Sequence, residues 1–187
     1  SLVAATAMRY IAPHNIHSFS SGSTMSEKQA MSEKNTGSAT PMFDIAELEG
    51  FAMEQLEVGM SAIYSKTVTE SDINLFCAIS GDTNPLHLDH EYAATTMFGG
   101  PIAHGMLAAS FISTVIGTKL PGPGCVYISQ NCRFKAPVRA GDTVRARVTI
   151  TEVNMERRRI KLETTCRVGD TVVIDGDAEV LVPSRGA

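Results

Sequence analysis

Strict alternation of apolar and polar residues through the last third of this 187-residue chain is its most constraining feature. The clearest case is "DTVRARVTITEV", in which every second residue from Val144 to Ile150 is apolar. Similar alternation occurs in the stretches at 125–134, 157–168 and 171–182. Successive side chains of a strand point to opposite faces, so this pattern predicts about four half-buried antiparallel strands. Gly141-Asp142 and Gly169-Asp170 supply turns, and the second predicts a tight hairpin.

An antiparallel sheet with one apolar face needs a second layer to cover it. The most apolar element is "HGMLAASFISTVIGTKL", residues 104–120, which is hydrophobic almost all round and is expected to be a helix wrapped by other structure. The economical arrangement is therefore an α+β fold in which one curved antiparallel sheet wraps around this central apolar helix. This arrangement is a single hot-dog fold.

Two further elements are expected before the apolar helix. A first strand is predicted at 61–68, followed by a helix with Thr69 as its N-cap and Asp72 three residues later. Gly81 is expected to end that helix. The stretch "EYAATTMFGGP", residues 91–101, predicts a short helical turn that ends where glycines and proline break the chain.

The N-terminal segment, residues 1–42, has a different composition from the rest of the chain. It is rich in Ser, Ala, Thr, Met and Asn and contains the near-duplicate "MSEKQAMSEKN". Such a segment buries too little apolar surface to order itself, so we expect it to be disordered, with the hot-dog domain at 43–187. Its first 24 residues weakly resemble a transit peptide, although an untidy N-terminus is favoured. The expected location is cytoplasmic, with mitochondrial as the alternative.

Composition excludes several classes of function. The net charge is −4 and the basic residues are scattered, so nucleic acid is not an expected partner. No apolar run reaches the ~20 residues of a membrane-spanning helix, so no membrane partner is expected. The cysteines form no C-x-x-C pair, which indicates a reducing compartment without structural zinc.

The stretch "GDTNPLHLDH", residues 81–90, concentrates polar chemistry in a turn. Asp82 and His87 can converge on one small molecule across the bend at Pro85, and both can exchange protons near neutral pH. A simple turn explains the same residues, because Gly, Asp, Asn and Pro are common turn formers. A metal site at His87, Asp89 and His90 is a weaker alternative, since the spacing fits no familiar zinc pattern, and no metal is predicted.

The stretch "PIAHGMLAAS", residues 101–110, opens the apolar helix with a histidine and a glycine. Backbone N–H groups at a helix N-terminus lack intrahelical acceptors, so the amide of Gly105 can bind a developing oxyanion. A glycine is equally explained by a neighbour that packs too closely for a Cβ. A serine hydrolase is disfavoured because no G-x-S-x-G sequence occurs.

The stretch "SGDTNPLHLDHEYAATTMFGGPIAHGML", residues 80–107, resembles the hydratase 2 motif of the MaoC-like, (R)-specific enoyl-CoA hydratases. The resemblance extends from "LEVGM" near residue 56 to the closing strand, about 130 residues, a usual length for one domain. It departs at His90, where relatives commonly carry proline. The resemblance implies that Asp82 and His87 hold and activate a water, while Asn84 and Pro85 shape the loop. It also implies that the Gly105 amide binds the thioester oxygen.

The implied activity is hydration of trans-2-enoyl-CoA to (R)-3-hydroxyacyl-CoA, without a cofactor, linking β-oxidation intermediates to polyhydroxyalkanoate synthesis or related lipid metabolism. One alternative is the reverse chemistry, a 3-hydroxyacyl thioester dehydratase acting on acyl carrier protein in fatty acid synthesis. Other hot-dog proteins hydrolyse thioesters, and a non-catalytic acyl-CoA-binding module is a further alternative. Intact Asp82, His87 and Gly105 argue against that last possibility.

The same resemblance indicates where substrate and partner bind. Ser113 and Ile116, on one side of the apolar helix, are predicted to line the acyl pocket, although core packing explains them nearly as well. Cations for the CoA phosphates are expected from Arg133, Lys135, Arg139 or the cluster Arg157 to Arg159. The exposed sheet edges, together with the resemblance, predict a homodimer.

Overall fold

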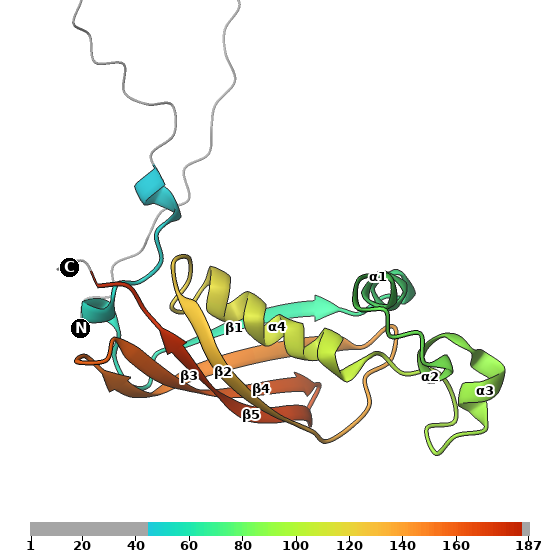
Figure 1. Cartoon of the computed structure of the whole chain (residues 1–187). Coiled ribbons are helices and arrows are strands. Elements are labelled where there is room, and N and C mark those ends of the chain that lie inside the picture. The colour runs from blue at the N-terminus through green and yellow to red at the C-terminus, as the bar shows by residue number, and fades with distance from the viewer. Residues whose placement is uncertain (1–44, 185–187) are drawn as a thin grey trace, which may run out of the picture. The chain divides into compact units, whose positions relative to one another are not determined.

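The computed structural model describes residues 45–184, and within this range the chain forms one five-stranded antiparallel sheet (Figure 1). The strands are β1 (Ser61–Thr67), β2 (Val126–Phe134), β3 (Thr143–Asn154), β4 (Arg159–Val168) and β5 (Thr171–Leu181). The helices are α1 (Glu70–Ser80), α2 (Pro85–Leu88), α3 (His90–Ala94) and α4 (Gly105–Thr118), with 3-10 helices at Ile45–Leu48 and Met53–Gln55. The N-terminal segment 1–42, which the sequence predicts to be disordered, lies outside the described residues.

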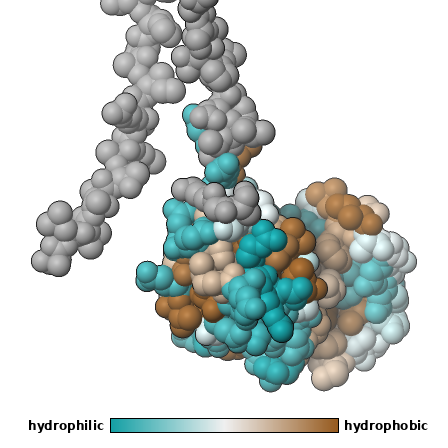
Figure 2. Space-filling view, turned by 60° about the vertical axis from the view of Figure 1, so that its left-hand side comes forward, coloured by the Kyte–Doolittle hydropathy of each residue, from teal (hydrophilic) through white to brown (hydrophobic). Residues whose placement is uncertain are grey.

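The strand order in the sheet is β1-β3-β4-β5-β2, so β1 and β2 form its two edges. The three consecutive strands β3, β4 and β5 pair as hairpins, whereas β2 pairs with β5. Edge strand β2 exposes large apolar side chains at Val126, Ile128 and Phe134. Figure 2 shows hydrophobic areas between hydrophilic ones on the described surface. The sheet therefore ends on an edge that carries apolar groups.

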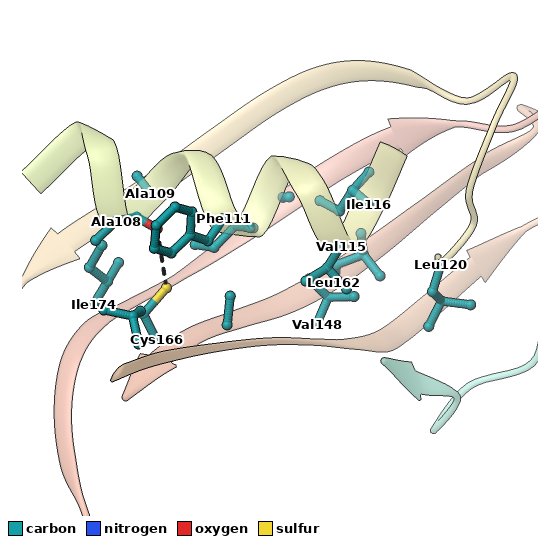
Figure 3. Close-up of a cluster of buried hydrophobic side chains, with 14 of the residues drawn as sticks. Ala108, Ala109, Phe111, Val115, Ile116, Leu120, Val148, Leu162, Cys166 and Ile174 are labelled. Atoms are coloured by element: carbon teal, nitrogen blue, oxygen red, sulfur yellow. Dashed lines mark hydrogen bonds between the residues drawn. The ribbon is translucent and has the colours of Figure 1, made fainter. Parts of the chain in front are cut away.

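Helix α4 lies along one face of the sheet and packs against β1, β3 and β4. Its buried side chains, among them Phe111 and Val115, meet inward residues of the strands such as Leu162 (Figure 3). Burying a side chain of this size contributes about 1.5–3 kcal/mol. The wrapped apolar helix and the hot-dog fold predicted from the sequence are confirmed.

The cysteines of the chain are free thiols that belong to this core or its margin. Cys166 is fully buried, and its Sγ lies 3.6 Å from the carbonyl oxygen of Ala108. Burial, with a smaller contribution from Cys132, raises the pKa of the Cys166 thiol to about 12. This thiol is therefore a neutral packing group, as the alternating pattern around it predicts.

Helix α1 begins and ends as predicted. The Thr69 side chain accepts the Asp72 N–H, and the Asp72 carboxylate accepts the Thr69 N–H at 2.9 Å, which completes a capping box. The hydrogen bond from the Thr69 backbone is the main cause that lowers the pKa of Asp72. At the other end Gly81 adopts a left-handed conformation, with φ of 76°, that reverses the chain.

Residues 81–104 form a separate segment between α1 and α4, and we call it the site segment. It contains only the short helices α2 and α3, which lie beyond the end of the sheet (Figure 1). The predicted short helical turn at 91–101 corresponds to α3 and the bend after it. The segment returns to the core at Ala103, whose N–H donates to the carbonyl of Val138 at 2.7 Å.

Candidate active site

The loop that opens the site segment is shaped by hydrogen bonds from side chains to backbone. Asn84 is the N-cap of α2, and its Oδ1 accepts the N–H of Leu86 at 3.0 Å. Pro85 occupies the first turn of that helix, where its missing N–H costs nothing. The Asp82 carboxylate accepts the Asn84 N–H at 3.2 Å through Oδ1, so its other oxygen remains available.

His87 lies on α2 with its ring half-buried. Its Nδ1 is 2.7 Å from the carbonyl oxygen of Ile102, and since a carbonyl can only accept, Nδ1 donates. In the neutral ring the lone pair therefore resides on Nε2. The contact with Ile102 sets the tautomer that allows Nε2 to accept a proton.

A second histidine, His104, joins Asp82 and His87. It is the N-cap of α4, is 2% exposed, and donates from Nε2 to the backbone carbonyl of Asp82 at 3.0 Å. Its ring stacks on that of His87, with centroids 3.8 Å apart and planes inclined by 30°. One ligand atom from each of Asp82, His87 and His104 lies within 4.8 Å of the others. The structure therefore brings the predicted pair together and adds a residue to which the sequence analysis gave no role.

The three residues considered as metal ligands from the sequence, His87, Asp89 and His90, do not come together in the structure. Asp89 caps α3, accepting the Tyr92 N–H at 2.9 Å, and His90 is exposed, so the set considered from sequence does not assemble. In the set Asp82, His87 and His104, the two imidazole rings are in contact, with centroids 3.8 Å apart and planes inclined by 30°. One nitrogen of each ring is already engaged, since Nδ1 of His87 and Nε2 of His104 donate to backbone carbonyl oxygens. The cluster of Asp82, His87 and His104 therefore replaces the set considered from sequence.

An apolar cavity of about 470 Å³ opens beside His87. It is lined by His87, Phe98, Ile102, Ala103, Gly105, Met106, Ala108, Phe134, Lys135, Ala136, Pro137, Val138, Val173 and Ile174. This volume and mostly apolar lining are typical of small-molecule sites. Among the lining residues His87 is the candidate base, and Lys135 places a cation on the wall.

Both features considered for Gly105 from the sequence, a helix-start N–H and a close neighbour, occur in the structure. It is the first residue of α4, where the backbone N–H has no acceptor within the helix. A Cβ at this position would lie 2.7 Å from Cε1 of Phe134, so only glycine fits beside that ring as it stands. The backbone of Gly105 is thereby exposed to the cavity, with its helix dipole favouring negative charge.

The residues predicted to bind the acyl chain lie elsewhere in this structure. Ile116 is fully buried in the core and Ser113 is exposed on α4, and neither lines the cavity beside His87. Met106, Phe134 and Ile174, which do line it, were not predicted as pocket residues. Their positions in alternating or apolar stretches carry no signal that separates a pocket wall from a core.

The predicted cations also differ in placement. Lys135 lines the cavity, whereas Arg139 donates to the carbonyl oxygens of Pro101 and Phe98 and so anchors the site segment. Arg133 pairs with Asp175 at 2.8 Å. Residues 157–159 lie at the opposite end of the sheet, because Arg159 pairs with Leu181 at the end of β5. Lys135 pairs with the same Asp175 at 3.6 Å, and of these predicted cations it is the one that lines the cavity.

The fold and site together define a hot-dog protein in which an aspartate and two histidines converge beside an apolar cavity at a helix N-terminus. The MaoC-like domain model matches residues 54–172, and the chain belongs to this family. It is 54% identical to an (R)-specific enoyl-CoA hydratase of Rhodospirillum rubrum over 71% of this chain and 92% of that protein. It is 51% identical to a 3-hydroxybutyryl-CoA dehydratase of Methylorubrum extorquens over 75% of this chain and 90% of that one.

A solved structure supports the same relationship. The unliganded (R)-hydratase PhaJ1 of Pseudomonas aeruginosa is 42% identical and superposes with a TM-score of 0.68, covering 73% of this chain and 88% of that one. In the part of the chain that the structure describes, no helix is long and apolar enough to cross a membrane.

Proposed function

We propose that the protein is an (R)-specific enoyl-CoA hydratase, a hydro-lyase that adds water to trans-2-enoyl-CoA to give (R)-3-hydroxyacyl-CoA. The observation that carries the proposal is the convergence of Asp82 and His87 beside a cavity onto which the Gly105 backbone opens. The named activities of the relatives, at 54% and 51% identity, support the same chemistry.

The proposed reaction uses these groups as follows. A water held between the Asp82 carboxylate and Nε2 of His87 loses a proton to the pair as its oxygen attacks C3. The electrons of the C2–C3 double bond move toward the thioester oxygen, where the Gly105 N–H stabilises the developing charge. A proton from the pair is then delivered to C2, which restores the carbonyl and the resting protonation of the pair.

The decisive experiment is to assay Asp82→Asn and His87→Gln with crotonyl-CoA, following loss of the conjugated thioester absorbance. Each variant is expected to lower kcat on the order of 10²- to 10⁴-fold, the usual contribution of general acid–base catalysis. Both substitutions keep side-chain size, and Asn at 82 keeps the oxygen that accepts the Asn84 N–H, so the free energy of unfolding should change little.

Matched controls lie in the same segment. Asp89→Asn and His90→Gln alter the same residue types a few positions later, outside the converging set. They should retain near wild-type kcat. Near wild-type turnover of a folded Asp82→Asn or His87→Gln variant would contradict the proposed function.

We further propose CoA as the carrier and polyhydroxyalkanoate synthesis or related lipid metabolism as the setting. The CoA-linked relatives are the more similar ones, whereas a mitochondrial 3-hydroxyacyl-[acyl-carrier-protein] dehydratase of Arabidopsis thaliana is 32% identical. Parallel assays with crotonyl-CoA and crotonyl-acyl carrier protein test this choice. A higher kcat/KM for the protein-bound substrate would favour the dehydratase alternative.

A homodimer is proposed as the working form. The apolar residues on edge strand β2 support pairing with a second copy, which would cover Val126 and Ile128. Light scattering that gives a monomer mass would contradict the dimer.

Ser113, which is exposed on α4 in one chain, remains a proposed acyl-pocket residue together with Ile116. We also propose a cytoplasmic location. The free cysteines support it, because thiols stay reduced in that compartment.

A further inference from the structure

His104 is an unusual residue for the core in which it lies. It is 2% exposed, and its ring lies between Phe76, at a centroid distance of 5.0 Å, and His87, at 3.8 Å. Among the residues that the structure describes, its Nδ1 is the one buried side-chain nitrogen or oxygen without a hydrogen-bond partner. Burying a polar nitrogen without a hydrogen-bond partner costs free energy. This cost indicates that the ring has a role beyond packing.

His104 is linked to every group that the proposed reaction uses, by contacts to Asp82 and His87 and by the chain to Gly105. Nε2 donates to the backbone carbonyl of Asp82 at 3.0 Å, which fixes the turn that carries this carboxylate. The face of the ring supports the His87 ring. The residue that follows His104 in the chain is Gly105, which begins α4 and lines the cavity.

We propose that His104 is a positioning residue that aligns Asp82 and His87 with each other and with the N-terminus of α4. This inference rests on the proposed hydratase function for its kinetic consequence, although its structural basis is independent of it. His104 acts through the Asp82 backbone and the His87 ring, and it does not touch the reacting atoms.

The structure also assigns the form of the ring. Because Nε2 donates to a carbonyl, it carries the proton, and a second proton on Nδ1 would be a buried donor without an acceptor. His104 therefore holds the Asp82 backbone through Nε2 while the face of its ring contacts His87.

The kinetic test compares two substitutions at His104. His104→Phe keeps a ring that can stack but loses the donor to Asp82, and is expected to lower kcat about 10- to 100-fold, the usual cost of a small misplacement of catalytic groups. KM should change less than threefold, because the cavity wall is intact. His104→Gln restores an N–H donor of similar reach, so its kcat should lie above that of His104→Phe. A His104→Gln rate at or below the His104→Phe rate overturns the assignment.

A stability control separates positioning from general packing. Phe76→Leu removes the ring on the other face of His104 and should destabilise the fold without touching Asp82 or His87. Its kcat per folded molecule should stay within about twofold of wild type. If Phe76→Leu lowers kcat as much as His104→Phe at equal loss of stability, His104 has only a structural role.

A spectroscopic arm tests the inference without any activity. Two-dimensional ¹H–¹⁵N spectra of the imidazole rings of the full chain should show a proton on Nε2 of His104. In His104→Phe the backbone amide signals of Asp82 and Asn84 should shift and exchange faster with solvent. Absence of hydratase activity in the wild type would overturn the proposed function but leave this test intact. A form of His104 with its only ring proton on Nδ1 would overturn the inference alone.

Discussion

The α4–sheet core and the site segment 81–104 are held together by different forces. In the core, inward residues of β3 such as Val144 and Val148 are fully buried against α4. In the site segment, Asp82, Asn84 and Asp89 are exposed, and helices α2 and α3 have only four and five residues. The core depends on apolar burial, whereas the site segment depends on individual hydrogen bonds from side chains to backbone.

The difference separates stability from activity. A typical hydrogen bond contributes about 0.5–1.5 kcal/mol, less than a buried aliphatic side chain, so the site segment adds little to the free energy of unfolding. Its hydrogen bonds nevertheless determine where Asp82 and His87 lie. We therefore expect substitutions in the core to affect mainly stability and those in the site segment to affect mainly turnover.

Among the changes that compare the core with the site segment, the largest effect is expected at Gly105, where the two regions meet. Gly105→Pro removes the backbone N–H that is proposed to bind the thioester oxygen. Proline is well tolerated at the first position of a helix, and His104, with φ of −59° and ψ of 133°, already has a conformation that suits a following proline. The kcat should fall on the order of 10²- to 10³-fold relative to Gly105→Ala, as for other lost oxyanion donors.

Gly105→Ala is the matched control because it adds a Cβ in the same place and keeps the N–H. Its Cβ displaces the half-exposed Phe134 ring, so the comparison between Ala and Pro isolates the N–H. Circular dichroism should show both variants folded. Equal kcat values for the two variants would mean that the Gly105 amide does not bind the reacting oxygen.

The next effect tests the core alone. Leu162 on β4 is fully buried and faces α4. Leu162→Ala should lower the free energy of unfolding by about 3 kcal/mol, since it removes apolar contacts and leaves a cavity. Urea denaturation measures the loss, and kcat per folded molecule should stay within about twofold of wild type. A large fall in kcat with little change in stability would contradict the separation of the two regions.

The core was largely predictable because burial repeats with the period of each element. Alternation predicted β3, β4 and β5, and the all-round apolar stretch predicted α4, whose observed limits are Gly105 and Thr118. Local chemistry predicted the ends of α1, since Thr69, Asp72 and Gly81 act within a few residues of one another. These signals are carried by neighbours in the chain.

The parts that were not predicted depend on contacts between distant residues. The pairing of β2 with β5, and hence the strand order, follows from how the chain crosses the sheet after α4. The role of His104 depends on Asp82, 22 positions earlier in the chain. A histidine within an apolar stretch has the same local pattern whether it packs in a core or supports an active site. Only the fold distinguishes these two cases.

The smallest effect compares two N-caps within the site segment. Asn84 caps α2 and Asp89 caps α3, each accepting a backbone N–H at about the same distance, 3.0 and 2.9 Å. Asn84→Ala and Asp89→Ala should each cost about 1 kcal/mol or less of stability, because a lost cap on a short exposed helix affects little else.

The effects of these two substitutions on turnover should differ, since α2 carries His87 and α3 carries none of the converging groups. Asn84→Ala is expected to lower kcat severalfold, whereas Asp89→Ala should remain near wild type in the crotonyl-CoA assay. Equal kcat values for the two variants at equal stability would show that the alignment of His87 does not depend on the cap of its own helix. The contacts of His87 with Ile102 and His104 would then be the ones that hold its ring in place.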